Sequence, residues 1–181
     1  MIYVFLADGF EEIEALCPVD ILRRGGIEVK TVGVGAKTIV GAHGIPVVCD
    51  LCDTEAQLDE NLEGIVLPGG MPGTINLENS SIVNKFIDYA NENNLLMSAI
   101  CAAPSILGHK GILKGKKATC YPSFEKDLIG ADFLAEPVVC DGNIITARAA
   151  GVALDFAFKL LEYLTGKEMV ESKMASILFV K

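Results

Sequence analysis

One cysteine stands where a strand passes into a helix, a common position for a nucleophile. Cys101 directly follows the apolar run Leu95 to Ile100 and precedes Ala102 and Ala103. This pattern indicates a sharp turn that lifts a side chain out of a sheet. A helix N-terminus aimed at the sulfur would lower the thiol pKa below its usual value of about 8.5. We expect a nucleophilic, oxidisable thiol; the alternative is a small buried apolar residue.

A cysteine nucleophile usually has an acid or base beside it, and histidine is the commonest choice. The sequence has only two histidines. His109 lies on the same predicted helix as Cys101, about 12 Å along its axis. His43 lies on a predicted hairpin, away from the expected active edge unless another subunit supplies it. Neither histidine is therefore expected to be the catalytic partner.

The carboxylates that follow the first predicted strand are better placed. Glu11, Glu12 and Glu14 fall within one helical turn, where acidic residues usually form a solvated helix N-terminus. Glu14 differs because the positions three, four and seven residues later are apolar. Burial on that face would raise its pKa, so Glu14 could hold a proton for the thiol or for a bound carbonyl compound.

Two glycines follow another apolar strand. Gly69 and Gly70 come after residues 64–67 and Pro68. Their bare backbone would let a ligand oxygen approach their N–H groups, and with the N–H of Ala102 they could form an oxyanion hole. An ordinary strand-exit turn is the alternative. The spacing fits no phosphate-binding glycine motif.

Composition and charge exclude several classes of function. The 181 residues suit one domain, spanning 1–181. A net charge of −9 argues against a stable nucleic-acid complex, and no apolar run is long enough for a membrane span. Six cysteines without a secretory signal indicate reduced thiols in the cytoplasm. Cys49 and Cys52 lack further zinc ligands, so we expect no metal.

Strands and helices alternate along the chain, which favours a three-layer α/β sandwich with a mostly parallel sheet and an appended β-hairpin. Turns that follow parallel strands meet at one edge, so the turns at Glu14, Gly69 and Cys101 should converge. Pro18 should bend or break the first helix. The expected strands are 2–7, 27–34, 64–67, 95–100, 117–120 and 143–147, the hairpin is 38–40 with 45–48, and the helices are 11–24, 81–93, 102–110 and 151–164.

Four segments in this order resemble the ThiJ/PfpI superfamily, in particular the branch of Parkinson disease protein 7, the protein deglycase. They are residues 8–15 (DGFEEIEA), 18–27 (PVDILRRGGI), 66–70 (VLPGG) and 99–104 (AICAAP). The resemblance covers nearly the whole chain. It implies a fold of the flavodoxin-like or class I glutamine-amidotransferase-like kind, a homodimer, and no cofactor or metal.

The resemblance also implies roles for single residues. Cys101 matches the reactive cysteine and Glu14 the buried acid hydrogen-bonded to it, while Gly69, Gly70 and Ala102 match the backbone lining of the pocket. Three further positions match residues of the pocket or the dimer interface: Arg24 near the interface, Arg148 before an active-site loop, and Tyr121, which replaces a pocket histidine of the family.

The resemblance implies a glutathione-independent glyoxalase or a deglycase. Its substrates would be α-oxoaldehydes such as methylglyoxal, or early glycation adducts on a protein or nucleotide. The alternative is a redox sensor or stress-induced chaperone in which Cys101 is oxidised to sulfinate. A peptidase is disfavoured because Ala102 stands where the protease-like branch has a histidine.

Overall fold

A seven-stranded sheet forms the middle layer of the molecule. The computed structural model describes residues 1–179; residues 180–181 of the predicted domain lie outside the described residues. The sheet is parallel except for one edge strand, as expected, and its central strands are buried on both faces. From edge to edge the strands are β10 (Val138–Asp141), β11 (Ile144–Ala147), β7 (Leu96–Ile100), β6 (Gly64–Leu67), β1 (Ile2–Leu6), β2 (Val29–Gly33) and β5 (Leu51–Cys52).

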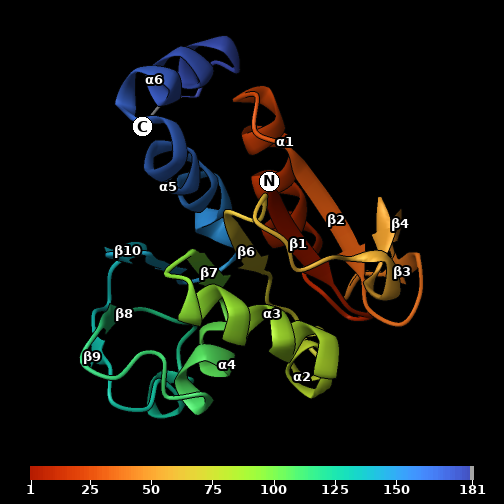
Figure 1. Ribbon diagram of the computed structural model, residues 1–181. Coiled ribbons are helices and arrows are strands. Elements are labelled where there is room, and N and C mark those ends of the chain that lie inside the picture. Colours follow the sequence, from red (N-terminus) through yellow and green to blue (C-terminus); the bar gives the residue numbers. More distant parts are fainter. Residues whose placement is uncertain (180–181) are drawn as a thin grey trace.

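Helices cover both faces of this sheet, which confirms the three-layer sandwich (Figure 1). Each face has its own apolar cluster against the sheet. Among residues 1–179, no helix has both the length and the apolar character that a membrane span requires. One face carries α1 (Glu12–Arg24), α5 (Ala153–Thr165) and α6 (Lys167–Ser176), and the other carries α2 (Gly73–Asn79), α3 (Ser81–Glu92) and α4 (Pro104–His109).

Two small sheets lie beside the main one. The predicted hairpin is present as antiparallel strands β3 (Thr38–Val40) and β4 (Pro46–Val48). The strand predicted at 117–120 is only β8 (Lys117–Ala118), which pairs with β9 (Asp132–Phe133) outside the main sheet. Short 3₁₀ helices η1 (Asp53–Glu55), η2 (Glu125–Asp127) and η3 (Ala150–Val152) complete the elements.

Two details of the predicted helices differ from the structure. Helix α1 runs through Pro18 without a break, because its buried residues pack on the sheet and on α5. The helix expected from Ala102 begins instead at Pro104, whose fixed φ and missing N–H suit the first helical position. Residues 101–103 therefore form a turn between β7 and α4.

Candidate active site

Three strand-exit turns meet at the carboxyl edge of the sheet, as the parallel topology requires. The N–H of Glu11 donates to the carbonyl of Gly69 at 2.9 Å, and the N–H of Gly73 donates to the carbonyl of Gly9 at 3.2 Å. The N–H of Gly69 donates to Oε2 of Glu14 at 2.9 Å. The turn after β1 is thus joined to the turn after β6, and Cys101 follows β7 beside them.

The backbone of Cys101 is held in a left-handed conformation. Its φ is +64°, which is uncommon for a residue with a side chain and carries a strain of order 1–3 kcal/mol. Its N–H donates to Ala147 at 2.9 Å, and its carbonyl accepts from the N–H of Tyr121 at 2.8 Å. Contacts on both sides therefore fix the turn that presents the sulfur.

Glu14 is the buried acid of this site. Its side chain, from the first turn of α1, is 1% exposed and hydrogen-bonds to Cys101. The backbone N–H groups of Gly69 and Ala150 also point at its carboxylate. Burial raises the pKa of Glu14 to about 7, and these hydrogen bonds offset only part of the rise. Near neutral pH this carboxyl group can both accept and release a proton.

The thiol pKa moves in the direction opposite to that expected from the sequence. Burial, together with the charge and the hydrogen bond of Glu14, raises the pKa of Cys101 to about 12. Because α4 is short and begins three residues later, its dipole does not outweigh burial. When Glu14 holds a proton, its charge is gone and it becomes a donor, so the two groups titrate as a coupled pair.

Backbone N–H groups reach the sulfur from two turns. Those of Gly70 and Ala102 hydrogen-bond to Cys101 and favour its thiolate form. The N–H of Gly69 is taken by Glu14 instead. Of the three amides predicted to line an oxyanion hole, two therefore surround the sulfur and the third positions the acid.

The three remaining candidate residues are distributed around the molecule. Arg24 lies at the exposed end of α1 and pairs with Asp20 at 2.7 Å. Arg148 directly follows β11, and its guanidinium group donates to the carbonyl of Ala135 at 3.3 Å. Tyr121 contacts Cys101 through its backbone N–H, while its side chain is 45% exposed. Within residues 1–179, none of these three side chains hydrogen-bonds to Glu14 or Cys101.

Ala150 lies in the loop after Arg148, which the resemblance places at the active site, but no role was predicted for this residue. Ala150 contributes only a backbone N–H to Glu14, from η3. Its methyl side chain has no reactive or polar group, so the residue type could not mark Ala150 as part of the site. Its position after β11, the strand beside β7, was the available indication.

A Gly69→Ala substitution should destabilise the protein by about 1–3 kcal/mol, because the added methyl group overpacks the site. A Cβ at Gly69 would lie 2.7 Å from both Cys101 Cβ and Glu14 Oε2. Urea unfolding would measure the change. Gly151→Ala is the matched control, since nothing lies within 4 Å of its added Cβ. Equal unfolding midpoints for the two variants would contradict the tight fit.

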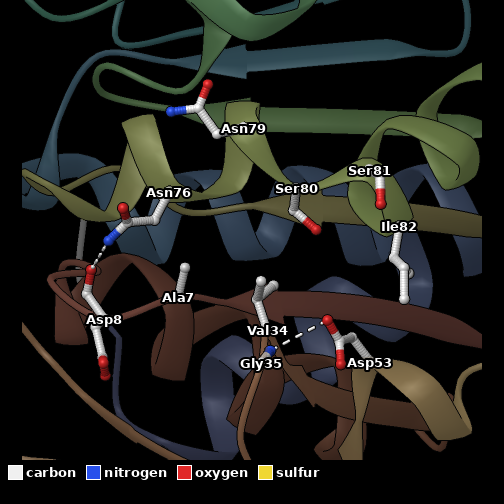
Figure 2. A pocket seen from close by; sticks show the side chains of 10 residues that line it. All are labelled: Ala7, Asp8, Val34, Gly35, Asp53, Asn76, Asn79, Ser80, Ser81 and Ile82. Atoms are coloured by element: carbon white, nitrogen blue, oxygen red, sulfur yellow. Dashed lines mark hydrogen bonds between the residues drawn. The ribbon is translucent and has the colours of Figure 1, made fainter.

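A separate cavity of about 470 Å³ lies at the same sheet edge, on the side of α2 and α3 (Figure 2). Its polar groups are partly engaged: Asn76 donates to the carbonyl of Asp8 at 2.8 Å, and Gly35 donates to Asp53 at 3.1 Å. Neither Cys101 nor Glu14 lines it. The cavity and the Cys101–Glu14 pair thus lie at different places along the same sheet edge.

Comparison with known proteins shows which proteins this chain resembles. Residues 1–163 match the family model described as the DJ-1/PfpI family. The chain is 35% identical over 178 residues to Protein dj-1beta of Drosophila melanogaster, covering 97% of this chain and 95% of that protein. It is 29% identical to Glutathione-independent glyoxalase DJR-1.2 of Caenorhabditis elegans, covering 94% of this chain and 91% of that protein.

Solved structures show the same relationship. The crystal structure of Drosophila melanogaster DJ-1beta superposes with a TM-score of 0.94 at 34% identity, covering 99% of this chain and 98% of that one. The sheet order, the flanking helices and the match along the sequence point to one family. The chain belongs to the DJ-1/PfpI family.

Proposed function

We propose that this protein is a glutathione-independent glyoxalase that converts α-oxoaldehydes, such as methylglyoxal, into 2-hydroxy acids. One observation carries the proposal: a thiol on a strained turn is hydrogen-bonded to a buried carboxyl group with a pKa of about 7. The relative in Caenorhabditis elegans that is named as a glyoxalase supports it.

The first step forms a covalent adduct. Ionised Glu14 accepts the thiol proton of Cys101 as the sulfur bonds to the aldehyde carbon. The carbonyl π electrons move to oxygen, and the N–H groups of Gly70 and Ala102 are the donors nearest to this developing charge. Glu14 then passes its proton to that oxygen, which gives a hemithioacetal and restores the carboxylate.

The second step moves a hydrogen between neighbouring carbons. Glu14 removes the proton from the carbon that bears sulfur, and the electrons shift to form an enediolate. The proton returns to the adjacent carbon, and the hydroxyl proton on the sulfur-bearing carbon passes to the neighbouring oxygen, which gives a 2-hydroxy thioester. Water then attacks this thioester, the carbon–sulfur bond breaks, and sulfur regains a proton as the hydroxy acid leaves. In the overall reaction, one molecule of α-oxoaldehyde and one molecule of water give one molecule of 2-hydroxy acid.

Lactate formation from methylglyoxal tests the proposal. Purified protein without glutathione should consume methylglyoxal and release lactate in equal amounts, measured by an enzymatic lactate assay. Early glycation adducts on protein or nucleotide are the second substrate class, assayed by recovery of the free amine. Absence of lactate above the no-enzyme control would exclude the glyoxalase.

This chemistry requires a reduced thiol, and all six cysteines are free. A cytoplasmic location would keep the thiol reduced, so we propose that the protein acts in the cytoplasm.

A redox-sensing role is the second candidate. The donors around Cys101, two backbone N–H groups and protonated Glu14, could hold the oxygens of a sulfinate. The raised thiol pKa slows the reaction with peroxide, so this role ranks below the enzyme. Peptide mass spectrometry after mild peroxide should show Cys101 oxidised before the exposed Cys140 if the sensor operates.

We further propose that the protein acts as a homodimer through an apolar face on α1. Ile13 and Leu16 of this helix are 52% and 37% exposed, and Ile45 and Leu154 beside them are 52% and 36% exposed. The four side chains surround a largely apolar hollow of about 400 Å³. Such a patch marks an interaction surface on a folded protein.

Leu16→Asp should convert this dimer into a monomer, because the carboxylate would be desolvated in the interface. Sedimentation equilibrium would measure the mass. Ile129→Asp is the matched control, since Ile129 is 54% exposed and does not line this hollow. A dimer that persists in Leu16→Asp would place the interface elsewhere.

A further inference from the structure

The turn of the β3–β4 hairpin brings an imidazole against two carboxylates at the start of α1. Nδ1 of His43 lies 2.9 Å from Oε2 of Glu12 and 3.7 Å from Oε2 of Glu11. One donor atom from each of these residues lies within 4.8 Å of the other two. The sequence suggested that His43 is away from the active edge, but the hairpin folds back onto α1.

The carboxylate of Glu12 is held in place before any ligand binds. Its side chain belongs to a residue only 5% exposed, and Oε1 accepts the backbone N–H of His43 at 2.8 Å. Gly41 makes this possible, because a Cβ there would lie 2.3 Å from Glu12 Oε1. With Oε1 bound to the hairpin backbone, Oε2 faces the imidazole.

The spacing of the donor atoms is that of a small cation site. Nitrogen and oxygen ligands about 2.0–2.1 Å from a tetrahedral zinc ion lie about 3.3 Å from one another. The distances from His43 Nδ1 to Oε2 of Glu12 and of Glu11, 2.9 and 3.7 Å, fall on either side of this value. Shifts of a few tenths of an ångström in the His43 side chain, which is 66% exposed, would complete the geometry.

The chemical types of the donors select the class of ion. An imidazole nitrogen suits zinc and its neighbours among the transition metals, whereas magnesium and calcium prefer oxygen alone. A hollow of about 270 Å³ leaves room for water at a remaining coordination position; it borders the proposed dimer face, with which it shares Ile13 and Ile45. We propose that Glu11, Glu12 and His43 bind a zinc-type divalent metal ion.

This site is distinct from the thiol chemistry proposed above. Its three donors come from the hairpin turn, the N-cap of α1 and the first residue of α1, and none is Cys101 or Glu14. Binding at Nδ1 displaces any proton carried there, because a metal-bound imidazole nitrogen is deprotonated. The ion would clamp the hairpin onto α1 through side chains as well as through backbone hydrogen bonds.

The other histidine supplies a matched control. His109 also faces two carboxylates, Glu78 at 2.5 Å and Asp127 at 3.7 Å. It uses Nδ1 for the first and Nε2 for the second, and these nitrogens point away from each other across the ring. One ion cannot bind the imidazole and both carboxylates there. The surroundings of His109 therefore resemble those of His43 in charge but lack the geometry of a metal site.

Zinc binding would be measured by competition with a chromophoric chelator, and cobalt(II) would report the ligand types by its visible spectrum. We expect one equivalent of zinc per chain. His43→Ala should weaken binding by about 100-fold and Glu11→Gln by about 10-fold, whereas His109→Ala should leave it unchanged. The cobalt spectrum should lack the near-ultraviolet charge-transfer band of thiolate ligands. Thermal unfolding without metal would confirm that each variant is folded.

Three results would overturn the proposal. The first is failure of the wild-type chain to take up zinc. The second is equal affinity in His43→Ala and the wild type. The third is a cobalt–thiolate band that disappears in Cys101→Ser, which would assign the ion to the active-site thiol. None of these results bears on lactate formation, so the metal site and the glyoxalase are tested separately.

Discussion

Cys101→Ser should lower kcat/KM for methylglyoxal by about three orders of magnitude or more, because a hydroxyl group replaces the attacking sulfur. Serine retains the size and the backbone of the turn but is far less acidic and less nucleophilic. Glu14 would still be present, yet it would have no thiol proton to accept. The measurement is the initial rate of lactate formation at saturating and limiting methylglyoxal.

Cys140→Ser is the matched control for this substitution. Cys140 is an exposed thiol on the edge strand β10, and its replacement should leave kcat/KM unchanged. Urea unfolding of both variants would show that neither has lost its fold. Appreciable turnover by folded Cys101→Ser would remove the thiol from the mechanism.

The position of the site could be predicted from the order of elements alone. Parallel strands place their following turns at one edge, and the apolar runs before Gly69 and Cys101 identified two of those turns. Glu14 was found because the residues one helical turn further along are apolar, so its face had to be buried. These inferences use spacing and polarity, which the sequence displays directly.

The details that the sequence did not reveal depend on contacts between distant segments. The thiol pKa was expected to fall, but burial of Cys101 beside an acid raises it to about 12. The N–H of Gly69 was expected to line an oxyanion hole, but it donates to the carboxylate of Glu14. His43 contacts Glu12 because the β3–β4 hairpin folds back onto α1. Each outcome is set by tertiary packing, which local patterns do not encode.

Glu14→Gln should lower kcat by about 10²–10⁴-fold, because an amide cannot carry protons between the reacting atoms. In the wild-type protein, kcat/KM should rise with pH and level off above the Glu14 pKa of about 7, since the ionised carboxylate is the acceptor. The titratable groups that act on Glu14 are Cys101 and Glu11. This rise should be absent from the residual activity of the variant.

The same substitution should stabilise the fold at alkaline pH. The folded pKa of Glu14, about 7, lies above its ordinary value of 4.5. The contribution of Glu14 is therefore most favourable below pH 4.5 and is lost as pH rises through 7. Each pKa unit corresponds to about 1.4 kcal/mol, so ionised Glu14 costs about 3 kcal/mol at pH 8. Glutamine is neutral throughout and can still accept the N–H of Gly69.

A lower rate together with a higher stability in Glu14→Gln would show that Glu14 serves catalysis and does not support the fold. Urea unfolding at pH 8 should show Glu14→Gln to be more stable than the wild type, with the difference shrinking towards pH 5. Glu92→Gln, an exposed change at the end of α3, should alter neither stability nor rate. A variant that loses both activity and stability at pH 8 would mean that ionised Glu14 supports the fold. A variant that gains stability while losing turnover would show that the protein keeps a destabilising carboxylate for its chemistry.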